Sequence, residues 1–516
     1  MKLKLNNTFT KNLPADPIKE NIVRQVNNAC FSYTNPTPCS SPSIIHFSKE
    51  MLLNLGLELQ DVQTKEYVNI FSGNSIAPNT TPFAMCYGGH QFGHWAGQLG
   101  DGRAINLFEI NHNNQQWAIQ LKGAGKTPYS RSADGLAVLR SSIREYLCSE
   151  AMHHLGVPTT RALNLVLSGD QVLRDILYNG HAAYEKGAIV TRVAPSFIRF
   201  GNFQIVSVRK EYENLKKLAD YTITHFFSHL GTPNKEAYIA FFQEVAEKTM
   251  DMIVHWERVG FVHGVMNTDN MSILGLTIDY GPYGWLENYD SNWTPNTTDK
   301  EHRRYRFGNQ APIAFWNLYQ LANALYPLIE DAKALEDILN KWEKTYYIKH
   351  HKMMLEKLGL SNSKENNSSL IADLKKLLEE SEIDMTLFFR QLSLFDGKHE
   401  QEFIKIILAC SYSENFAQYE TAWLDWLSIY ANEILNTNNP NRKAEMDATN
   451  PKYVLRNYMA QLAIDEADKG NYEVIESLFE LLKHPYDEQT EHEKWFAKRP
   501  DWAKHKVGCS MLSCSS

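Results

Sequence analysis

The sequence predicts an α+β protein with two lobes, a small β-rich lobe that contains one long helix and a larger helical lobe. Between residues 97 and 194 the apolar residues alternate in short runs typical of strands, with a single helical stretch among them. After Pro195 the apolar residues recur at helical spacing in long segments, apart from a polar stretch over residues 262–311.

The β-rich lobe is expected to hold one helix over residues 136–155. Its apolar residues fall on one face, and Gly156 is a suitable C-terminal stop. The strands are expected at residues 103–110, 116–122, 162–167, 171–174 and 188–193.

The helical lobe is expected to end in a helical extension. Asn-rich and Ser-rich composition predicts surface loops at residues 361–369 and 436–451. Helices are expected at residues 215–230, 235–259, 312–325 and 332–351, and helical periodicity resumes over 453–482. The predicted units are an N-terminal extension (1–96), the β-rich lobe (97–194), the helical lobe (195–435) and a C-terminal extension with a cysteine-containing tail (436–516).

Composition narrows the functional classes. The 516 residues are 43% hydrophobic, enough for a large core, and the net charge of −8 offers no overall cationic field for nucleic acid or an anionic membrane.

No apolar run is long enough for a signal peptide or a membrane span. Seven cysteines without a Cys-x-x-Cys pair indicate neither a disulfide scaffold nor a zinc site. We therefore expect a cytoplasmic protein.

A glycine-rich segment, Gly97-Gln-Leu-Gly100-Asp-Gly102-Arg103, directly precedes an expected strand. Closely spaced glycines let backbone amides approach phosphate oxygens. A hairpin turn without a ligand explains the same residues equally well. The segment Gly123–Thr127 is not a P-loop, because that motif requires glycine at position 120, which is Gln.

Lys122 ends an alternating apolar strand, and Glu145 lies in the middle of the expected helix. Protein kinases pair a strand lysine with a helix glutamate in this order. Taken alone, each residue is more simply a solvated surface charge. The order of the motifs favours the pair.

Residues 263–281 have the order of a kinase catalytic loop followed by its metal-binding motif. His263 is followed seven positions later by Asn270, and Asp279-Tyr-Gly stands in place of Asp-Phe-Gly. The usual catalytic aspartate position is Val265, which cannot accept a proton. Asp269 is the nearest carboxylate that can replace it. A polar turn between two elements is the alternative interpretation.

His90 and His94 are separated by a metal-ligand spacing, but the surrounding glycines predict a loop instead of a helix. We expect them to pack or to form hydrogen bonds.

These motifs resemble the selenoprotein O family (SelO, YdiU-type), in its cysteine-containing bacterial form. Its members are pseudokinases with a protein-kinase-like bilobal fold that act as protein adenylyltransferases. The resemblance covers nearly the whole chain. It rests on the segments Phe9–Pro17, Tyr87–His94, Leu99–Arg103, Leu121–Gly125, Thr127–Gly135, Arg192–Gly201, Met266–Asn270 and Ser513–Ser516.

The resemblance implies transfer of AMP from ATP to Ser, Thr or Tyr hydroxyls of proteins, with ATP inverted relative to kinases and pyrophosphate released. Asp269 would be the base, Asn270 and Asp279 would bind Mg²⁺ or Mn²⁺, and Glu145 would orient Lys122. The implied nucleotide contacts are Gly100, Gly102, Arg103, Lys122, Asp134, Gly135, Arg192, Arg199 and Asp279. From the residues alone, an atypical phosphotransferase that uses Asp269 and a nucleotide-binding scaffold stay open.

Cys509 and Cys514 lie in a small, polar tail that is predicted to be mobile and accessible to oxidants. In some relatives a tail cysteine pairs with one in the loop after the metal-binding aspartate, but residues 280–311 contain none. We expect at most a local bridge between Cys509 and Cys514, without effect on activity.

Overall fold

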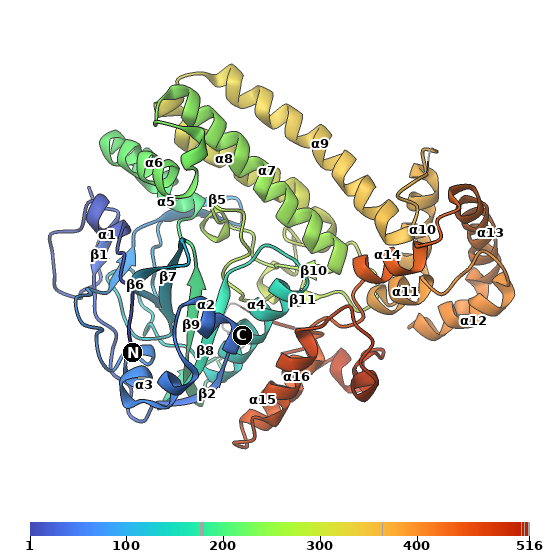
Figure 1. The fold of residues 1–516 in the computed structure, drawn as a ribbon, viewed down its shortest axis with the longest axis horizontal. Helices are drawn as coiled ribbons and strands as arrows, with labels where there is room; N and C mark the ends of the chain where they lie inside the picture. The colour runs from blue at the N-terminus through green and yellow to red at the C-terminus, as the bar shows by residue number, and fades with distance from the viewer. Residues whose placement is uncertain (176–179, 364, 507, 510, 514–516) are drawn as a thin grey trace.

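The computed structural model describes residues 1–175, 180–363, 365–506, 508–509 and 511–513. It is a mixed α+β structure with a sheet-containing N-terminal region and a large helical C-terminal part (Figure 1). The predicted α+β class is therefore confirmed. No helix in the described ranges is long and apolar enough to cross a membrane.

A seven-stranded antiparallel sheet forms the centre of the N-terminal region, in the order β1-β3-β6-β7-β9-β8-β2. Both edge strands come from the segment before residue 97, so this extension completes the sheet. The two segments expected at 162–174 form one strand, interrupted by a register shift between Leu167 and Gln171. The strands are β1 (Phe31–Tyr33), β2 (Ser43–Phe47), β3 (Phe83–Met85), β6 (Ala104–His112), β7 (Gln115–Lys122), β8 (Arg161–Arg174) and β9 (Ala183–Ala194).

Helices cover both faces of the sheet. On one face lies α4 (Leu139–His154), which packs against β8 and β9 and is buried over most of its length. It ends as predicted, because Gly156 adopts φ +72°. On the other face, α2 (Lys49–Asn54) and α3 (Lys65–Phe71) share an apolar core with the sheet, which includes Tyr67, Ile119 and Ile189.

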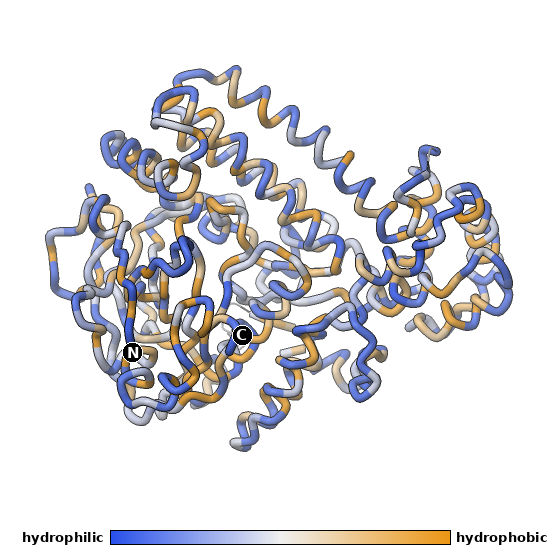
Figure 2. Tube along the Cα trace, viewed as in Figure 1, coloured by the Kyte–Doolittle hydropathy of each residue, from blue (hydrophilic) through white to orange (hydrophobic). Residues whose placement is uncertain are grey.

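The helical part divides into a group next to the sheet and a distal group with its own apolar core (Figure 1). The long helices α7 (Lys235–Val259) and α9 (Ala332–Leu358) alternate hydrophobic and hydrophilic residues along their length (Figure 2), as a one-sided apolar face requires. The first group is α5 (Phe200–Val208), α6 (Tyr212–Phe226), α7 (Lys235–Val259), α8 (Gln310–Ile329) and α9 (Ala332–Leu358); the second is α10 (Ser368–Glu380), α11 (Met385–Leu392), α12 (Glu400–Cys410), α13 (Glu420–Thr437) and α14 (Arg442–Thr449).

The loop predicted at 436–451 is wrong in its second half, because α14 forms there. Arg442 at its start is buried and donates to the carbonyl oxygen of Phe395 at 2.7 Å, and Met446 is fully buried. Tertiary packing outweighs the polar local composition.

The chain then returns to the sheet region. The segment expected to be helical over 453–482 forms two helices, α15 (Asn457–Ala467) and α16 (Glu473–Leu482), with Gly470 at φ +86° between them. Both pack against α4. The helix that carries Glu145 is thus held by the sheet and by the end of the chain.

Candidate active site

A cavity of about 830 Å³ lies where the sheet meets the helical part. Residues from β7, β9, the glycine-rich turn and the loops after α7 line it together. Among the predicted site residues, those that line the cavity are Gly100, Gly102, Arg103, Lys122, Asp134, Gly135, Arg192, Asp269, Asn270 and Asp279.

The glycine-rich turn borders this cavity and packs on the segment 127–135. Gly100 has φ +71°, and a Cβ there would lie 2.4 Å from the ring of Tyr129. Gly135 has φ +75°, and its Cβ would lie 2.1 Å from the carbonyl oxygen of Gly125. Neither position tolerates a side chain without displacement of its neighbours. The close packing brings both backbones to the cavity wall.

Lys122, at the end of β7, pairs with Glu145 of α4 as the motif order predicts. The other oxygen of Glu145 accepts a hydrogen bond from Arg192 Nε of β9. Burial opposes ionisation of Glu145, but Arg192 and Lys122 outweigh it and hold the pKa of Glu145 below its usual range. Burial also lowers the pKa of Lys122 to about 8, although Glu145 acts in the opposite direction.

Asp279 continues this charge network. Its Oδ1 lies 2.8 Å from Arg192 Nη2, and its Oδ2 pairs with Arg199. The two guanidinium groups outweigh burial and hold the pKa of Asp279 well below its usual range. Arg199 does not line the cavity in this structure; it lies buried against Asp279 and donates to the carbonyl oxygen of Asp269 at 2.8 Å.

The loop over residues 263–270 contains the short 3₁₀ helix η3 (Thr268–Asn270). His263 is buried, stacks on Trp256 and contacts the carbonyl oxygen of Ile278 at 2.8 Å, which ties this loop to Asp279. Asn270 Nδ2 donates to the carbonyl oxygen of Val265 at 2.9 Å. The amide oxygen of Asn270 is therefore the atom left to face a ligand.

Asp269 also lies in η3 and is only 7% exposed. Its Oδ2 accepts a hydrogen bond from Gln91, whereas Oδ1 has no hydrogen-bond partner among the described residues. Burial raises the pKa of Asp269 to about 6. A carboxylate with these properties suits proton transfer near neutral pH.

The residues at this position fit a hard divalent cation. Asn270 and Asp279 offer amide and carboxylate oxygens, the ligand type that Mg²⁺ prefers. Asp279 also pairs with two arginines, but each carboxylate oxygen has a second lone pair for a cation.

The family model described as "Protein adenylyltransferase SelO" matches residues 19–483. The chain belongs to the SelO family. It is 59% identical to the "Protein nucleotidyltransferase YdiU" of Flavobacterium johnsoniae, over 100% of this chain and 99% of the relative. The proteins of the same description from Rhodopirellula baltica and Aromatoleum aromaticum are 52% and 51% identical, with the same coverage. The chain is thus a nucleotidyltransferase.

Within this SelO-family site, Asp134 has a partner that sequence reasoning missed. Both of its oxygens accept hydrogen bonds from Arg174 of β8, at 2.7 and 2.8 Å. Burial opposes ionisation, but Arg174 outweighs it and lowers the pKa of Asp134. Arg174 lines the cavity as well. Arg174 lies 40 residues away from Asp134 in the chain, so the contact leaves no local signal in the sequence.

His90 and His94 lie on a hairpin, β4 (Gly88–Gln91) and β5 (His94–Gln98), where a loop was expected. His90 forms a hydrogen bond with Gln204 at 3.1 Å, as expected, and His94 is exposed. Among the described residues, the group with metal-ligand geometry for three His, Cys, Asp or Glu side chains is a different one, outside the cavity lining: Glu50, His153 and His154.

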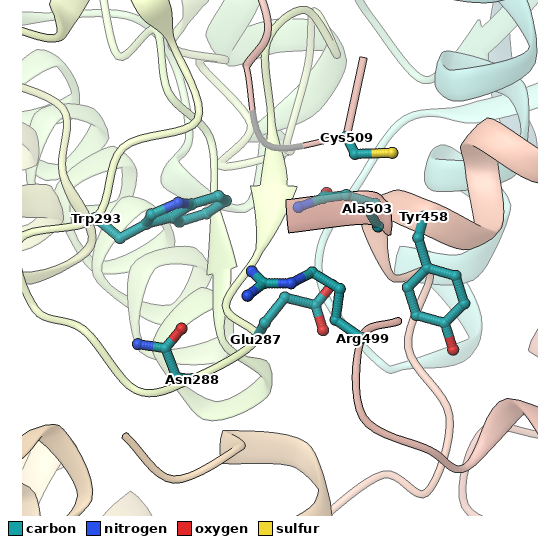
Figure 3. Close-up of a pocket in the computed structure, with 8 residues that line it drawn as sticks. Glu287, Asn288, Trp293, Tyr458, Arg499, Ala503 and Cys509 are labelled. Atoms are coloured by element: carbon teal, nitrogen blue, oxygen red, sulfur yellow. The ribbon is translucent and has the colours of Figure 1, made fainter. Parts of the chain in front are cut away.

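The prediction of an accessible tail is wrong for Cys509, which is 2% exposed. The tail is hydrogen-bonded to the loop that follows Asp279: Thr297 N donates to the carbonyl oxygen of Leu512 at 2.8 Å. Cys509 borders a small cavity of about 20 Å³, in which Glu287 and Arg499 lie side by side (Figure 3). Burial raises the pKa of the Cys509 thiol to about 11. Cys514 lies outside the described residues.

Proposed function

We propose that this SelO-family chain transfers AMP from ATP to hydroxyl side chains of proteins and releases pyrophosphate. The observation that carries the proposal is the replacement of the usual loop aspartate by Val265, while Asp269, Asn270 and Asp279 all line one cavity with Lys122. The names of its relatives, protein nucleotidyltransferases, support protein substrates.

We place the phosphates of ATP between the glycine-rich turn and the buried cations. Arg103, Lys122 and Arg192 line the cavity from the sheet side and can neutralise the charge that develops on pyrophosphate. In this proposal the α-phosphate faces Asp269, which is the inverse of the orientation in kinases. The fold is accordingly proposed to be kinase-like and bilobal, with the cavity between the lobes.

In the transfer step, Asp269 accepts the proton of the acceptor hydroxyl, and the hydroxyl oxygen forms a bond to the α-phosphorus. The bond from that phosphorus to the pyrophosphate oxygen breaks. Asn270 and Asp279 would hold Mg²⁺, or Mn²⁺, which neutralises phosphate charge when bound. Arg192 and Arg199 fix the Asp279 carboxylate from two sides.

ATP labelled separately at the α or γ phosphate tests this function. The purified chain is incubated with each ATP, with itself and with casein as acceptors. We expect label on protein from α-labelled ATP alone, and loss of it in Asp269→Asn. Label from γ-labelled ATP would establish an atypical phosphotransferase, and label from neither, with ATP binding retained, would establish a nucleotide-binding scaffold.

A further inference from the structure

The hairpin β4–β5 contacts the loop that carries Asp269 at three consecutive residues. His90 N donates to Thr268 Oγ1 at 2.7 Å, and Phe92 N lies 3.3 Å from Asn267 Oδ1. Between them, Gln91 Nε2 donates to Asp269 Oδ2 at 3.3 Å. Two backbone donors and one side-chain donor of the hairpin thus contact three neighbouring residues of the loop.

The backbone of the hairpin also comes unusually close to Asp269. A Cβ on Gly89 would lie 2.5 Å from Asp269 Oδ1 and 2.8 Å from Asp269 Cβ. Real Cβ atoms are not found at such distances, so any side chain at position 89 would displace the carboxylate. Gly89 has no positive φ, so this close approach is the feature that requires glycine there.

Gln91 is well placed to fix the orientation of this carboxylate. Asp269 is buried, and its Oδ1 has no hydrogen-bond partner in the described ranges. The hydrogen bond from Gln91 therefore distinguishes the two oxygens of Asp269. Gln91 and Asp269 line the same cavity, which places this contact beside the reacting groups of the proposed function.

We propose that Gln91 is a positioning residue, which fixes the orientation of the Asp269 carboxylate at the cavity by a hydrogen bond from its side-chain amide to Oδ2. This inference rests on the proposed function for the role of Asp269. Gln91 itself exchanges no proton and acts only through the orientation of the carboxylate.

The test uses Gln91→Glu, which keeps the size of the side chain but removes the donor. We expect AMP transfer to fall about tenfold to a hundredfold in kcat, with ATP affinity and melting temperature near those of the wild type. His94→Ala, an exposed change in the same hairpin, is the matched control and should retain activity. In an Asp269→Asn background, Gln91→Glu should cause no further loss, because both changes act on one group.

Wild-type kcat in Gln91→Glu, or a further loss in the Asp269→Asn background, would overturn the proposal. Crystal structures of the wild type and Gln91→Glu give a readout that does not depend on the reaction. We expect the Asp269 carboxylate to rotate away in the variant; an unchanged orientation contradicts the inference. Absence of AMP transfer by the wild type would instead refute the proposed function, and the structures would still decide whether Gln91 orients Asp269.

Discussion

Arg192 Nη2 lies 2.8 Å from Asp279 Oδ1, so an ion pair joins the sheet to the loop expected to bind metal. This pair belongs to a row of alternating charges. Lys122, Arg192 and Arg199 supply three positive charges, and Glu145 and Asp279 supply two negative ones. Lys122 and Arg192 of this row also line the cavity, where their charges can bind an anionic ligand such as a phosphate.

Asp279→Ala is expected to reduce AMP transfer about a hundredfold or more. The change removes a metal ligand of the proposed site and leaves Arg192 and Arg199 without their counter-charge. The measurement is transfer of α-labelled AMP at saturating ATP. Asp487→Ala removes an exposed carboxylate and should leave transfer unchanged. Transfer by Asp279→Ala at the wild-type rate would refute the metal assignment.

Glu145→Gln should destabilise the fold as well as reduce activity. Glu145 is 3% exposed and pairs with two buried cations, which the neutral amide would leave without a compensating charge. Loss of one partner of a buried ion pair typically costs about 3–5 kcal/mol. Urea unfolding monitored by circular dichroism measures the change, with Glu343→Gln, an exposed change on α9, as control. An unchanged free energy of unfolding would mean that Lys122 and Arg192 find other partners.

The parts of the site that sequence could predict are those with a local signal. The pair of Lys122 and Glu145 is predictable because Lys122 ends a recognisable strand and Glu145 lies in the middle of a recognisable helix. The contacts of Asp134 with Arg174 and of Asp269 with Gln91 span 40 and 178 residues, and depend on how strands and loops pack. No spacing in the sequence encodes such contacts.

Long-range packing also explains where the observed fold differs from the fold predicted from the sequence. The sequence predicts that the segment before residue 97 is an extension outside the β-rich lobe. Its short strands β1 and β2 instead form the two edges of the sheet. Their pairing partners, β3 and β8, lie far along the chain. Helix α14 forms in an Asn-rich segment because Arg442 and Met446 are buried against other helices. In each case tertiary contacts decide what local composition leaves open.

Glu257 gives the molecule a pH-dependent stability that is separate from the proposed site. It lies in α7 and accepts hydrogen bonds from Tyr346 at 2.9 and 3.1 Å, with Lys375 and His350 lining the same small cavity. Burial raises the pKa of Glu257 to about 7. Between about pH 4.5 and pH 7, Glu257 is therefore protonated in the folded state and ionised in the unfolded state.

The sign of the effect follows from this raised pKa. The stabilisation from protonated Glu257 is complete below about pH 4.5 and is lost as the pH rises through 7. Glu257→Gln stays neutral at every pH. Relative to the wild type, its free energy of unfolding should therefore be higher at pH 8 than at pH 5, by an amount on the order of 3 kcal/mol. Urea unfolding at both pH values measures the difference. Glu343→Gln, which changes an exposed residue of α9, should show no such trend.

Cys509 should resist thiol reagents in the native protein, contrary to what its place in a polar tail suggests. Its side chain is buried, and the raised pKa of about 11 leaves almost no thiolate at pH 8. Short treatment with iodoacetamide, followed by digestion and mass spectrometry, should find Cys509 unmodified, and modified once guanidinium chloride is present. Lys506, three residues before Cys509, packs over the ring of Trp502, so Trp502→Ala is expected to increase the native reactivity of Cys509 by loosening this segment. Rapid modification of Cys509 in the folded wild type would show that the tail leaves the loop at Thr297 readily, and that the thiol is open to oxidants after all.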